Sequence, residues 1–371
     1  MIDKILIGDI FESQAQTIIN TVNCVGIMGK GIAAEFKKRF PEMFKDYKLK
    51  CERNQVVLGK PYLYKRLFNP WIINFPTKQH WRSLSKIKDI QDGLEYLTKK
   101  YKEWGIQSLA VPPLGCGNGQ LEWRQVGPLI YSILNRMEIS VELYAPFGTS
   151  PKELTRDFLS QTPNIGKIDG QQITNYLNPA WLVLVEILYE LEKHRYRTPV
   201  GRTIFQKIAY VATELNLPTN FQYKQSSFGP FSNDVKKAIS ILANNGLVVE
   251  EQYGKMFRLT VGSNYLSMRE KYKSEIEKYR KIIERTSDLF ARMDTQQSEI
   301  VTTIFYSARQ LKKQNSSSIT ENEIFTYVLN WKKRRRPPLD KTQVASAIRN
   351  LAMLRWLDVE YSEELPVSEN I

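Results

Sequence analysis

Two short segments of this 371-residue chain combine glycines with asparagine amides directly after predicted strands. The first contains Asn20, Asn23, Gly26, Gly29 and Gly31, and the second contains Gly115, Gly117, Asn118 and Gly119. Glycine permits positive φ and lets backbone N–H groups approach a diphosphate closely, while asparagine amides can bond ribose hydroxyls. One such loop alone could be a tight turn, but two favour nucleotide binding. Neither matches GxxxxGK[ST] or GxGxxG, which excludes a P-loop and a Rossmann fingerprint.

Lys78 is the side chain best placed for covalent chemistry. It follows the buried-looking run "WIINFP", so its tip is expected at the carboxyl end of a strand. A neutral lysine amine can attack the anomeric carbon or the ring-opened aldehyde of a ribose. For this its pKa must fall below about 10.4, through desolvation or through nearby cations such as Lys30, Arg82 and Lys86. The alternative is an ordinary solvated lysine, because most lysines lie at the surface.

The elements that must position these groups alternate between strand and helix over residues 1–150. β-branched runs at 4–10, 16–23, 62–78, 106–115 and 139–146 are separated by helical patterns, one of which ends at Gly105 as a C-cap. Such alternation predicts an α/β sandwich, with helices on both faces of a largely parallel sheet. Ligands of these sheets bind at the carboxyl ends of the strands.

The remaining sequence changes character. Residues 151–170 lose periodicity and predict a linker, and residues 171–371 are mainly helical. A Ser-capped helix within "FGPFSNDVKKAISILANNGLVVEEQYGKMFRLT", followed by a glycine turn and two strands, resembles a winged helix. "VKKAISILANNGLVVE" from Val235 also aligns with "VASAIRNLAMLRWLDVE" from Val344, which indicates either two related modules or shared amphipathic periodicity.

Composition narrows the classes of protein. A net charge of +14 favours an anionic partner such as a nucleotide, a nucleic acid or an acidic protein. Three cysteines without paired spacing argue against a disulfide framework or a zinc site, and favour a reducing compartment. The N-terminus lacks a signal-peptide layout, and the longest apolar run, at 181–191, is too short to cross a bilayer. We therefore expect a soluble, cytoplasmic protein with no membrane partner.

Several ordered motifs together resemble a macrodomain, the ADP-ribose-binding fold. They are "GDI" at 8–10, "IINTVN" at 18–23, "GIMGKGIA" at 26–33 and "PLGCGNGQLEW" at 113–123. "MGKGIAAEFKKRFP" and "FPTKQHWR" are similar to the branch that contains terminal ADP-ribose glycohydrolase and the DarG antitoxins of DarT–DarG pairs. The resemblance covers residues 1 to about 150, and "FGPFSNDV" extends it toward the DarG tail.

The resemblance implies roles for individual residues. Asp9 would accept from the adenine amino group beside the Ile10 backbone, Asn20 and Asn23 would flank the distal ribose, and the two glycine loops would hold the phosphates. Lys78 would be the catalytic lysine, and Tyr144 or Phe147 would supply a ring beside adenine. The implied ADP-ribose contacts are Asp9, Ile10, Asn20, Asn23, Gly26, Met28, Gly29, Lys30, Gly31, Thr77, Gly115, Cys116, Gly117, Asn118, Gly119 and Tyr144. No metal and no cofactor are implied.

The chain departs from the pattern at one point. Terminal ADP-ribose glycohydrolase carries an acid in its second glycine loop, where this sequence has Gly119. Glu122 lies nearby but at an expected helix start, and His80 could move a proton or be an ordinary loop histidine. The sequence leaves the general acid open.

The resemblance also implies a function, that of an antitoxin. Residues 1–150 would hydrolyse ADP-ribose from thymine bases of single-stranded DNA, and residues 171–371 would bind the DNA-modifying toxin DarT. Trp81 and its basic neighbours could help to bind the DNA. The five cations Lys332–Arg336 are a further candidate DNA contact. The alternative is a non-catalytic ADP-ribose reader fused to a winged-helix DNA-binding regulator.

Overall fold

The chain divides into two compact units. The computed structural model describes residues 1–161, 177–194, 198–254, 256–314 and 318–366. One unit comprises Met1–Tyr176 with Ser240–Asn245, and the other comprises Leu177–Ile239 with Gly246–Ile371. Among the described residues, no helix combines the length and the apolar character needed to cross a membrane.

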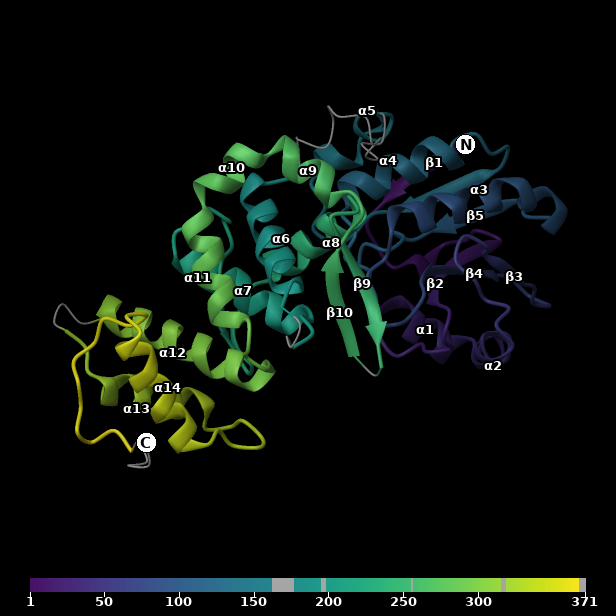
Figure 1. Ribbon diagram of the computed structural model, residues 1–371. Coiled ribbons are helices and arrows are strands. Elements are labelled where there is room, and N and C mark those ends of the chain that lie inside the picture. The colour runs from purple at the N-terminus through teal and green to yellow at the C-terminus, as the bar shows by residue number, and fades with distance from the viewer. Residues whose placement is uncertain (162–176, 195–197, 255, 315–317, 367–371) are drawn as a thin grey trace. The chain divides into compact units, whose positions relative to one another are not determined.

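A six-stranded sheet forms the centre of the N-terminal unit (Figure 1). Its strands are β1 (Ile2–Leu6), β2 (Thr17–Asn23), β3 (Tyr62–Tyr64), β4 (Trp71–Lys78), β5 (Ser108–Val111) and β6 (Ser140–Tyr144). The spatial order is β1-β6-β5-β2-β4-β3, and every pair is parallel except β3 with β4. The predicted, largely parallel α/β sheet is therefore confirmed.

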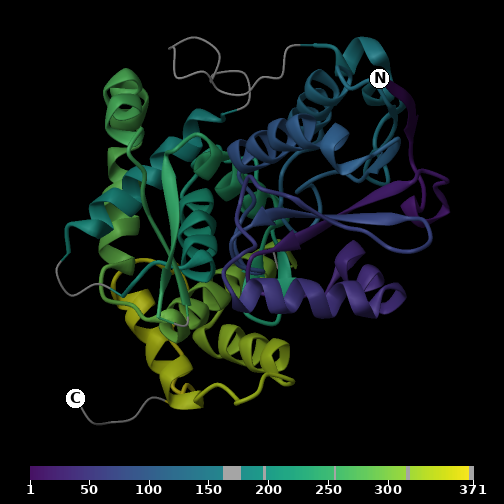
Figure 2. The same ribbon diagram turned by 90° about the vertical axis from the view of Figure 1, so that its right-hand side faces the viewer.

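Helices cover both faces of this sheet (Figure 2). The four main helices are α1 (Gly31–Arg39), α2 (Pro41–Glu52), α3 (Ile87–Trp104) and α4 (Trp123–Leu134). Leu94 of α3 and Ile130 of α4 belong with Phe75 of β4 to the core on one face. Phe36 and Tyr47, from α1 and α2, contribute to the core on the other. The two hydrophobic layers fix the sheet rigidly, and its carboxyl edge with it.

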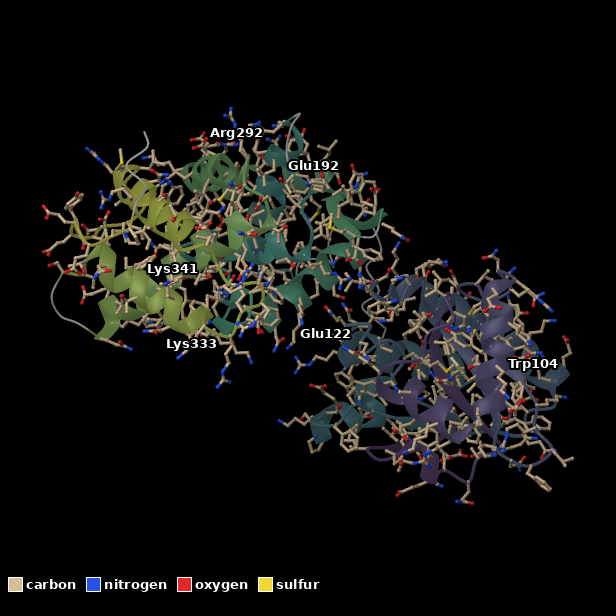
Figure 3. All side chains as sticks on the ribbon, turned by 90° about the horizontal axis from the view of Figure 1, so that it is seen from below. Trp104, Glu122, Glu192, Arg292, Lys333 and Lys341 are labelled. Carbon is tan, nitrogen blue, oxygen red and sulfur yellow. The ribbon has the colours of Figure 1, made fainter. Side chains whose placement is uncertain are left out.

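Helix α3 ends as the sequence predicts. Gly105 has φ +75° and its N–H donates to the carbonyl of Lys102, while Ile106 N donates to Tyr101 O. This is the left-handed C-cap geometry that glycine adopts most readily. Trp104 at this end of α3 and Glu122 at the start of α4 lie at opposite ends of the unit in Figure 3. The connection through β5 thus carries the chain from the amino edge of the sheet to its carboxyl edge.

The N-terminal unit continues past residue 150. Two short helices, η2 (Pro151–Leu154) and α5 (Arg156–Leu159), follow β6, and η1 (Ile10–Glu12) follows β1. Leu159 is fully buried in the core beside α4, and the Trp123 indole donates to the carbonyl of Glu153 at 3.2 Å. The first part of the expected linker is therefore packed structure. Residues 162–170 of that linker lie outside the described residues.

The C-terminal unit is mainly helical (Figure 1). Its helices are α6 (Pro179–Glu192), α7 (Arg202–Glu214), α8 (Asn233–Asn244) as far as Ile239, α9 (Tyr265–Lys271), α10 (Lys273–Lys278), α11 (Arg280–Phe290), α12 (Thr295–Gln314), α13 (Glu321–Lys332) and α14 (Lys341–Met353). Two antiparallel hairpins interrupt them: β7 (Lys224–Ser226) with β8 (Gly229–Phe231), and β9 (Val248–Tyr253) with β10 (Met256–Val261).

The order predicted around α8 is present. The Ser232 hydroxyl accepts from the N–H of Asp234 at 3.1 Å, and the β9–β10 hairpin follows α8. A winged-helix identity for this region stays a prediction. The aligned segment from Val344 forms α14, but in the described part of the chain no hairpin follows it, so only the helix is common to the two segments.

Charged side chains lie inside this unit. Lys207 of α7 is 3% exposed, and burial, followed by the positive charge of Lys332, lowers its pKa to about 7. Glu299 of α12 accepts from Lys332 at 2.8 Å and from Arg335 at 3.1 Å. Removing one partner of such a buried pair leaves an uncompensated charge, so the cluster is sensitive to substitution.

We expect Lys207 to make the stability of this unit depend on pH. Its pKa is about 7 when folded and about 10.4 when unfolded. Between these values the unfolded state binds more protons, so the free energy of unfolding should rise by about 2 kcal/mol from pH 7 to pH 9. Denaturant titrations at both pH values should show this rise in the wild type and lose most of it in Lys207→Met. The exposed Lys224→Met variant should keep it, and an equal rise in Lys207→Met would contradict the assignment.

Candidate active site

The carboxyl edge of the sheet brings the predicted site residues together in a defined order. Asp9 follows β1, and Phe147 follows β6. The second glycine loop follows β5, the first follows β2, and Lys78 ends β4. Because β1, β6, β5, β2 and β4 are neighbours in this order, the groups form a row along one edge.

Asn23 organises the first glycine loop. Its Nδ2 donates to Ile27 O at 2.6 Å, and its Oδ1 accepts from Val25 N at 3.0 Å. Gly26 takes φ +78° inside this turn. The Tyr47 hydroxyl donates to Asn23 O at 2.7 Å, so α2 also supports the loop. Sequence reasoning missed Tyr47, because a tyrosine on an amphipathic helix carries no local mark of such a role.

The two glycine loops meet at Gly31. A Cβ at this residue would lie 3.2 Å from Nδ2 of Asn118, and its φ is +60°. Gly31 is also the first residue of α1, which follows the exposed Lys30. The free N–H groups of a helix N-terminus attract anions. Gly29 is exposed and a Cβ there would meet only the Ile27 side chain, at 3.9 Å.

Close packing around Gly119 holds the second glycine loop in a compact turn. A Cβ at Gly119 would stand 2.2 Å from the Ser85 hydroxyl and 2.5 Å from Gly115 O. Ser85 N donates to Gly119 O at 3.1 Å, and Leu121 N donates to Gly115 O at 3.0 Å. At Gly117, by contrast, a Cβ would meet nothing within 4 Å. The carboxylate that the related enzyme places in this loop therefore has no room at position 119.

Lys78 lies beside the first loop and reaches the second. It pairs with Asn23 across the parallel strands β4 and β2, is 8% exposed, and donates from Nζ to Asn118 O at 3.0 Å. The preceding residue, Thr77, is also buried and donates to Val22 O at 3.3 Å. The predicted juxtaposition of this lysine with both loops is thus present in the fold.

His80 lies close to the same amine. Burial, followed by the positive charges of Arg82 and Lys78, lowers the pKa of His80, and its Nδ1 accepts from the N–H of Arg82 at 3.2 Å. The imidazole is therefore neutral at pH 7, with Nε2 carrying the proton. Arg82 stacks on the Trp81 ring at 4.5 Å from its centroid, so the cation and the aromatic ring form one exposed corner.

Asn20 and Met28 occupy the interior and not the rim of the site. Asn20 is fully buried three residues before the end of β2, and its Nδ2 donates to Asn74 Oδ1 at 2.8 Å. Met28 is 3% exposed, with its sulfur 3.9 Å from the Asn20 amide. Both side chains anchor the loop to the core, and ligand contact by either stays a prediction.

The other end of the row, where adenine is expected, has an exposed carboxylate and an exposed aromatic ring. Asp9 is exposed, caps η1 by accepting from Phe11 N at 3.0 Å, and lies 3.8 Å from Arg39. Ile10 is buried. The structure differs from the expectation at Tyr144, which is 6% exposed with its hydroxyl on Glu142, whereas Phe147 is 82% exposed. A stacking ring at this end is therefore better supplied by Phe147.

Cys116 and Glu122 contribute no obvious nucleophile or acid. Burial, followed by the charge of Glu122, raises the pKa of the Cys116 thiol to about 12, so it stays protonated. Glu122 is the N-cap residue of α4, as its place before the helix predicted. Lys78 is consequently the strongest candidate for a reacting group in the row.

Comparisons with known proteins agree with this geometry. Residues 19–130 match the Macro domain family. The DNA ADP-ribosyl transferase–DNA ADP-ribosyl glycohydrolase fusion protein of Thermosipho africanus is 43% identical over 157 residues, which are 38% of this chain and 40% of that protein. The DNA ADP-ribosyl glycohydrolase of Thermus aquaticus is 34% identical over 241 residues, 63% of this chain and 62% of the relative.

A solved structure is also similar. The macrodomain of Mycobacterium tuberculosis DarG is 43% identical, with a TM-score of 0.38, and the match covers 39% of this chain and 98% of that one. This chain spans less than two thirds of the length of the two curated relatives named above. The N-terminal unit, with its mostly parallel sheet and its two glycine loops, is a macrodomain, and the chain is similar to DNA ADP-ribosyl glycohydrolases.

Proposed function

We propose that the N-terminal unit hydrolyses the N-glycosidic bond that joins ADP-ribose to a thymine base of single-stranded DNA. The observation that carries this proposal is the position of Lys78, within 3.0 Å of the second glycine loop and beside Asn23 of the first. The row of groups has the order of the parts of ADP-ribose: an adenine end at Asp9 and Phe147, diphosphate loops, and an amine where the distal ribose ends. The relatives named as DNA ADP-ribosyl glycohydrolases support this substrate class.

The diphosphate would be held mainly by backbone N–H groups. The available N–H groups are those at the N-terminus of α1 and in the peptide groups around Gly26 and Gly117. The exposed Lys30 would add a positive charge beside the diphosphate. Backbone donors fixed by packing act without reorganisation when the ligand arrives. Because the loops that hold the diphosphate are fixed by packing, they would also hold the distal ribose in position against Lys78.

The proposed reaction has two steps. In the first, the neutral Lys78 amine forms a bond to C1″, the C1″–N bond to thymine breaks, and the lysine proton is transferred to the departing base. In the second, water adds at C1″, the lysine–carbon bond breaks, and the amine regains its proton as ADP-ribose leaves. Neutral His80 can donate a hydrogen bond from its Nε2–H to the reacting groups in either step, while its Nδ1 accepts from the backbone N–H of Arg82.

For the C-terminal unit we propose that it binds a DNA ADP-ribosyl transferase of the DarT type. The alignment with the Thermus aquaticus relative extends over 241 residues and so continues well past the macrodomain. The Thermosipho africanus relative is named as a fusion of transferase and glycohydrolase, which places the two activities on one chain there. An antitoxin that both binds the transferase and removes its product would have the architecture of this chain.

The assay that tests the N-terminal proposal uses an oligonucleotide carrying ADP-ribose on thymine. We expect the full-length protein to release free ADP-ribose and restore the unmodified oligonucleotide, both resolved by chromatography and mass spectrometry. Binding of ADP-ribose without release would instead identify a reader. Co-purification with the transferase tests the second proposal separately, and its absence would leave the hydrolase proposal standing.

Phe147 should contribute to ADP-ribose affinity without contributing to stability. Its ring is 82% exposed, so Phe147→Ala should leave the melting temperature unchanged. Loss of a ring stacked on adenine should raise the Kd for ADP-ribose roughly tenfold, measured by calorimetry. Tyr144→Phe is the control, because it removes only a buried hydroxyl 3.3 Å from Glu142 and should change the Kd little. An unchanged Kd in Phe147→Ala would contradict stacking of adenine on this ring.

A further inference from the structure

The turn between β7 and β8 presents an aromatic side chain to solvent. Ser227 and Phe228 form its tip, and Phe228 is 64% exposed. The next two residues, Gly229 and Pro230, are buried. Most of the Phe228 ring therefore faces solvent at the tip of a short hairpin, where its π-face is accessible for stacking.

Two buried lysine side chains hold this tip in place. Lys207 donates to the carbonyls of Phe228 and Pro230, and Lys332 donates to the carbonyl of Ser227 at 2.8 Å. Gly229 has φ +90°, and a Cβ there would come within 3.0 Å of the Lys207 nitrogen. The carbonyls of Ser227, Phe228 and Pro230 are thus held by buried side chains, which fixes the backbone that carries the Phe228 ring. Pre-organised aromatic side chains lose little conformational entropy on binding.

The basic segment Lys332–Arg336 divides into two sets of side chains. Lys332 and Arg335 turn inward to Glu299, which corrects the expectation that all five cations face a ligand. Lys333, Arg334 and Arg336 are exposed. Figure 3 shows Lys333 at the edge of the C-terminal unit. Only these three cations are placed to neutralise phosphates.

Lys332 connects the turn that carries Phe228 to the three exposed cations. Lys332, which anchors the turn through Ser227, directly precedes Lys333 in the chain, so both features lie in the same region of the surface. The carboxylates bonded in this region are already engaged: Glu299 by two cations, and Asp340 by the N–H of Gln343 at the start of α14. The region therefore keeps a positive charge beside an exposed ring.

From this arrangement we infer that Phe228, Lys333, Arg334 and Arg336 form a binding surface for single-stranded DNA. An unpaired base stacks on the Phe228 ring while the three cations contact the phosphates on either side of it. Stacking on an aromatic platform beside a basic track is the usual way in which proteins bind single strands without reading their sequence. A duplex keeps its bases stacked internally and cannot use the ring. This surface lies in the C-terminal unit and does not depend on the chemistry of Lys78.

The first test measures stacking. The full-length protein is titrated into a fluorescein-labelled oligothymidine of 20 nucleotides, and anisotropy gives the Kd. We expect Phe228→Ala to raise this Kd roughly tenfold. Tyr361→Ala removes an aromatic ring that is 66% exposed elsewhere in the unit and should have no effect. Equal affinities for the wild type and Phe228→Ala, or preference for duplex over the single strand, would overturn the inference.

The second test measures phosphate contacts. The triple variant Lys333→Ala/Arg334→Ala/Arg336→Ala should reduce the slope of log K against log salt by about 2, because each neutralised phosphate of a single strand contributes about 0.7. The matched variant Lys273→Ala/Lys281→Ala/Arg292→Ala removes the same charge from exposed positions on α10, α11 and the residues that follow, and should keep the slope. Equal slopes for the two triple variants would show a general charge effect and refute the surface.

A third measurement separates this surface from the proposed function. Hydrolysis of an ADP-ribosylated thymidine mononucleotide should proceed at the wild-type rate in Phe228→Ala, because that substrate has no strand to reach the surface. If the variants instead weaken binding of the transferase and leave oligothymidine binding intact, the surface serves a protein partner and the inference is wrong.

Discussion

Replacing Lys78 by alanine should abolish glycohydrolase activity and leave ADP-ribose binding in place. The amine is 8% exposed at the end of β4, and its hydrogen bond to Asn118 O fixes it against the second loop. Removing the reacting nucleophile of an enzyme lowers the rate by several orders of magnitude, so we expect a loss of about 10³-fold or more. Single-turnover release of ADP-ribose from a modified oligonucleotide measures it.

The controls for Lys78 separate chemistry from charge. Lys30→Ala removes an exposed cation from the same rim, and should weaken binding modestly while leaving the single-turnover rate of the bound substrate nearly unchanged. Lys78→Arg keeps the charge but cannot supply a neutral amine, because the guanidinium stays protonated, and it should be as inactive as the alanine variant. Full activity of Lys78→Arg would show that position 78 needs only a positive charge, and that Lys78 is not the nucleophile.

Borohydride treatment during turnover tests the covalent step itself. When the lysine–C1″ adduct opens its ribose ring it becomes a Schiff base, and borohydride would reduce this to a stable amine that adds the mass of ADP-ribose less one oxygen to one peptide. We expect this adduct on the peptide that contains Lys78, and its absence from the alanine variant. Rapid turnover with no trapped species would favour direct attack by water, with the lysine acting on the leaving base.

Local patterns in the sequence predict the framework of the site well. The alternation of strands and helices predicts the sheet, and Gly105 caps α3 as its position after an amphipathic pattern requires. The same patterns place Lys78 and both glycine loops at the ends of strands. In a parallel sheet this is enough to bring them to one edge, because all carboxyl ends of the strands lie on the same side.

Side-chain direction was not predictable in the same way. Asn20 and Asn23 are three residues apart in one strand, yet Asn20 bonds to Asn74 inside the sheet while Asn23 holds the loop. Lys332 and Lys333 are adjacent, yet one is buried on Glu299 and the other is exposed. The partners of the two buried side chains, Asn74 for Asn20 and Glu299 for Lys332, lie more than 30 residues away in the chain. No local sequence pattern therefore predicts these contacts.

The second glycine loop offers the other large effect. Gly119→Ala should destabilise the N-terminal unit by about 3 kcal/mol, since a Cβ would overlap the Ser85 hydroxyl at 2.2 Å and Gly115 O at 2.5 Å. For a unit of this size, the loss corresponds to a fall in melting temperature of roughly 5–10 °C. The displaced loop would also move Asn118 away from Lys78, so the Kd for ADP-ribose should rise at least about tenfold.

Gly117→Ala is the matched control within the same loop. A Cβ at this position meets nothing within 4 Å, so the melting temperature should stay within about 1–2 °C of the wild type.

A Gly119→Asp variant tests whether the second loop could supply an acid to complete the reaction. If backbone packing forbids any side chain at 119, then Gly119→Asp cannot restore an acid to this loop, and it should be at least as unstable as Gly119→Ala. A well-folded Gly119→Asp variant with faster turnover would show that the loop can open to admit the acid, and would contradict this expectation.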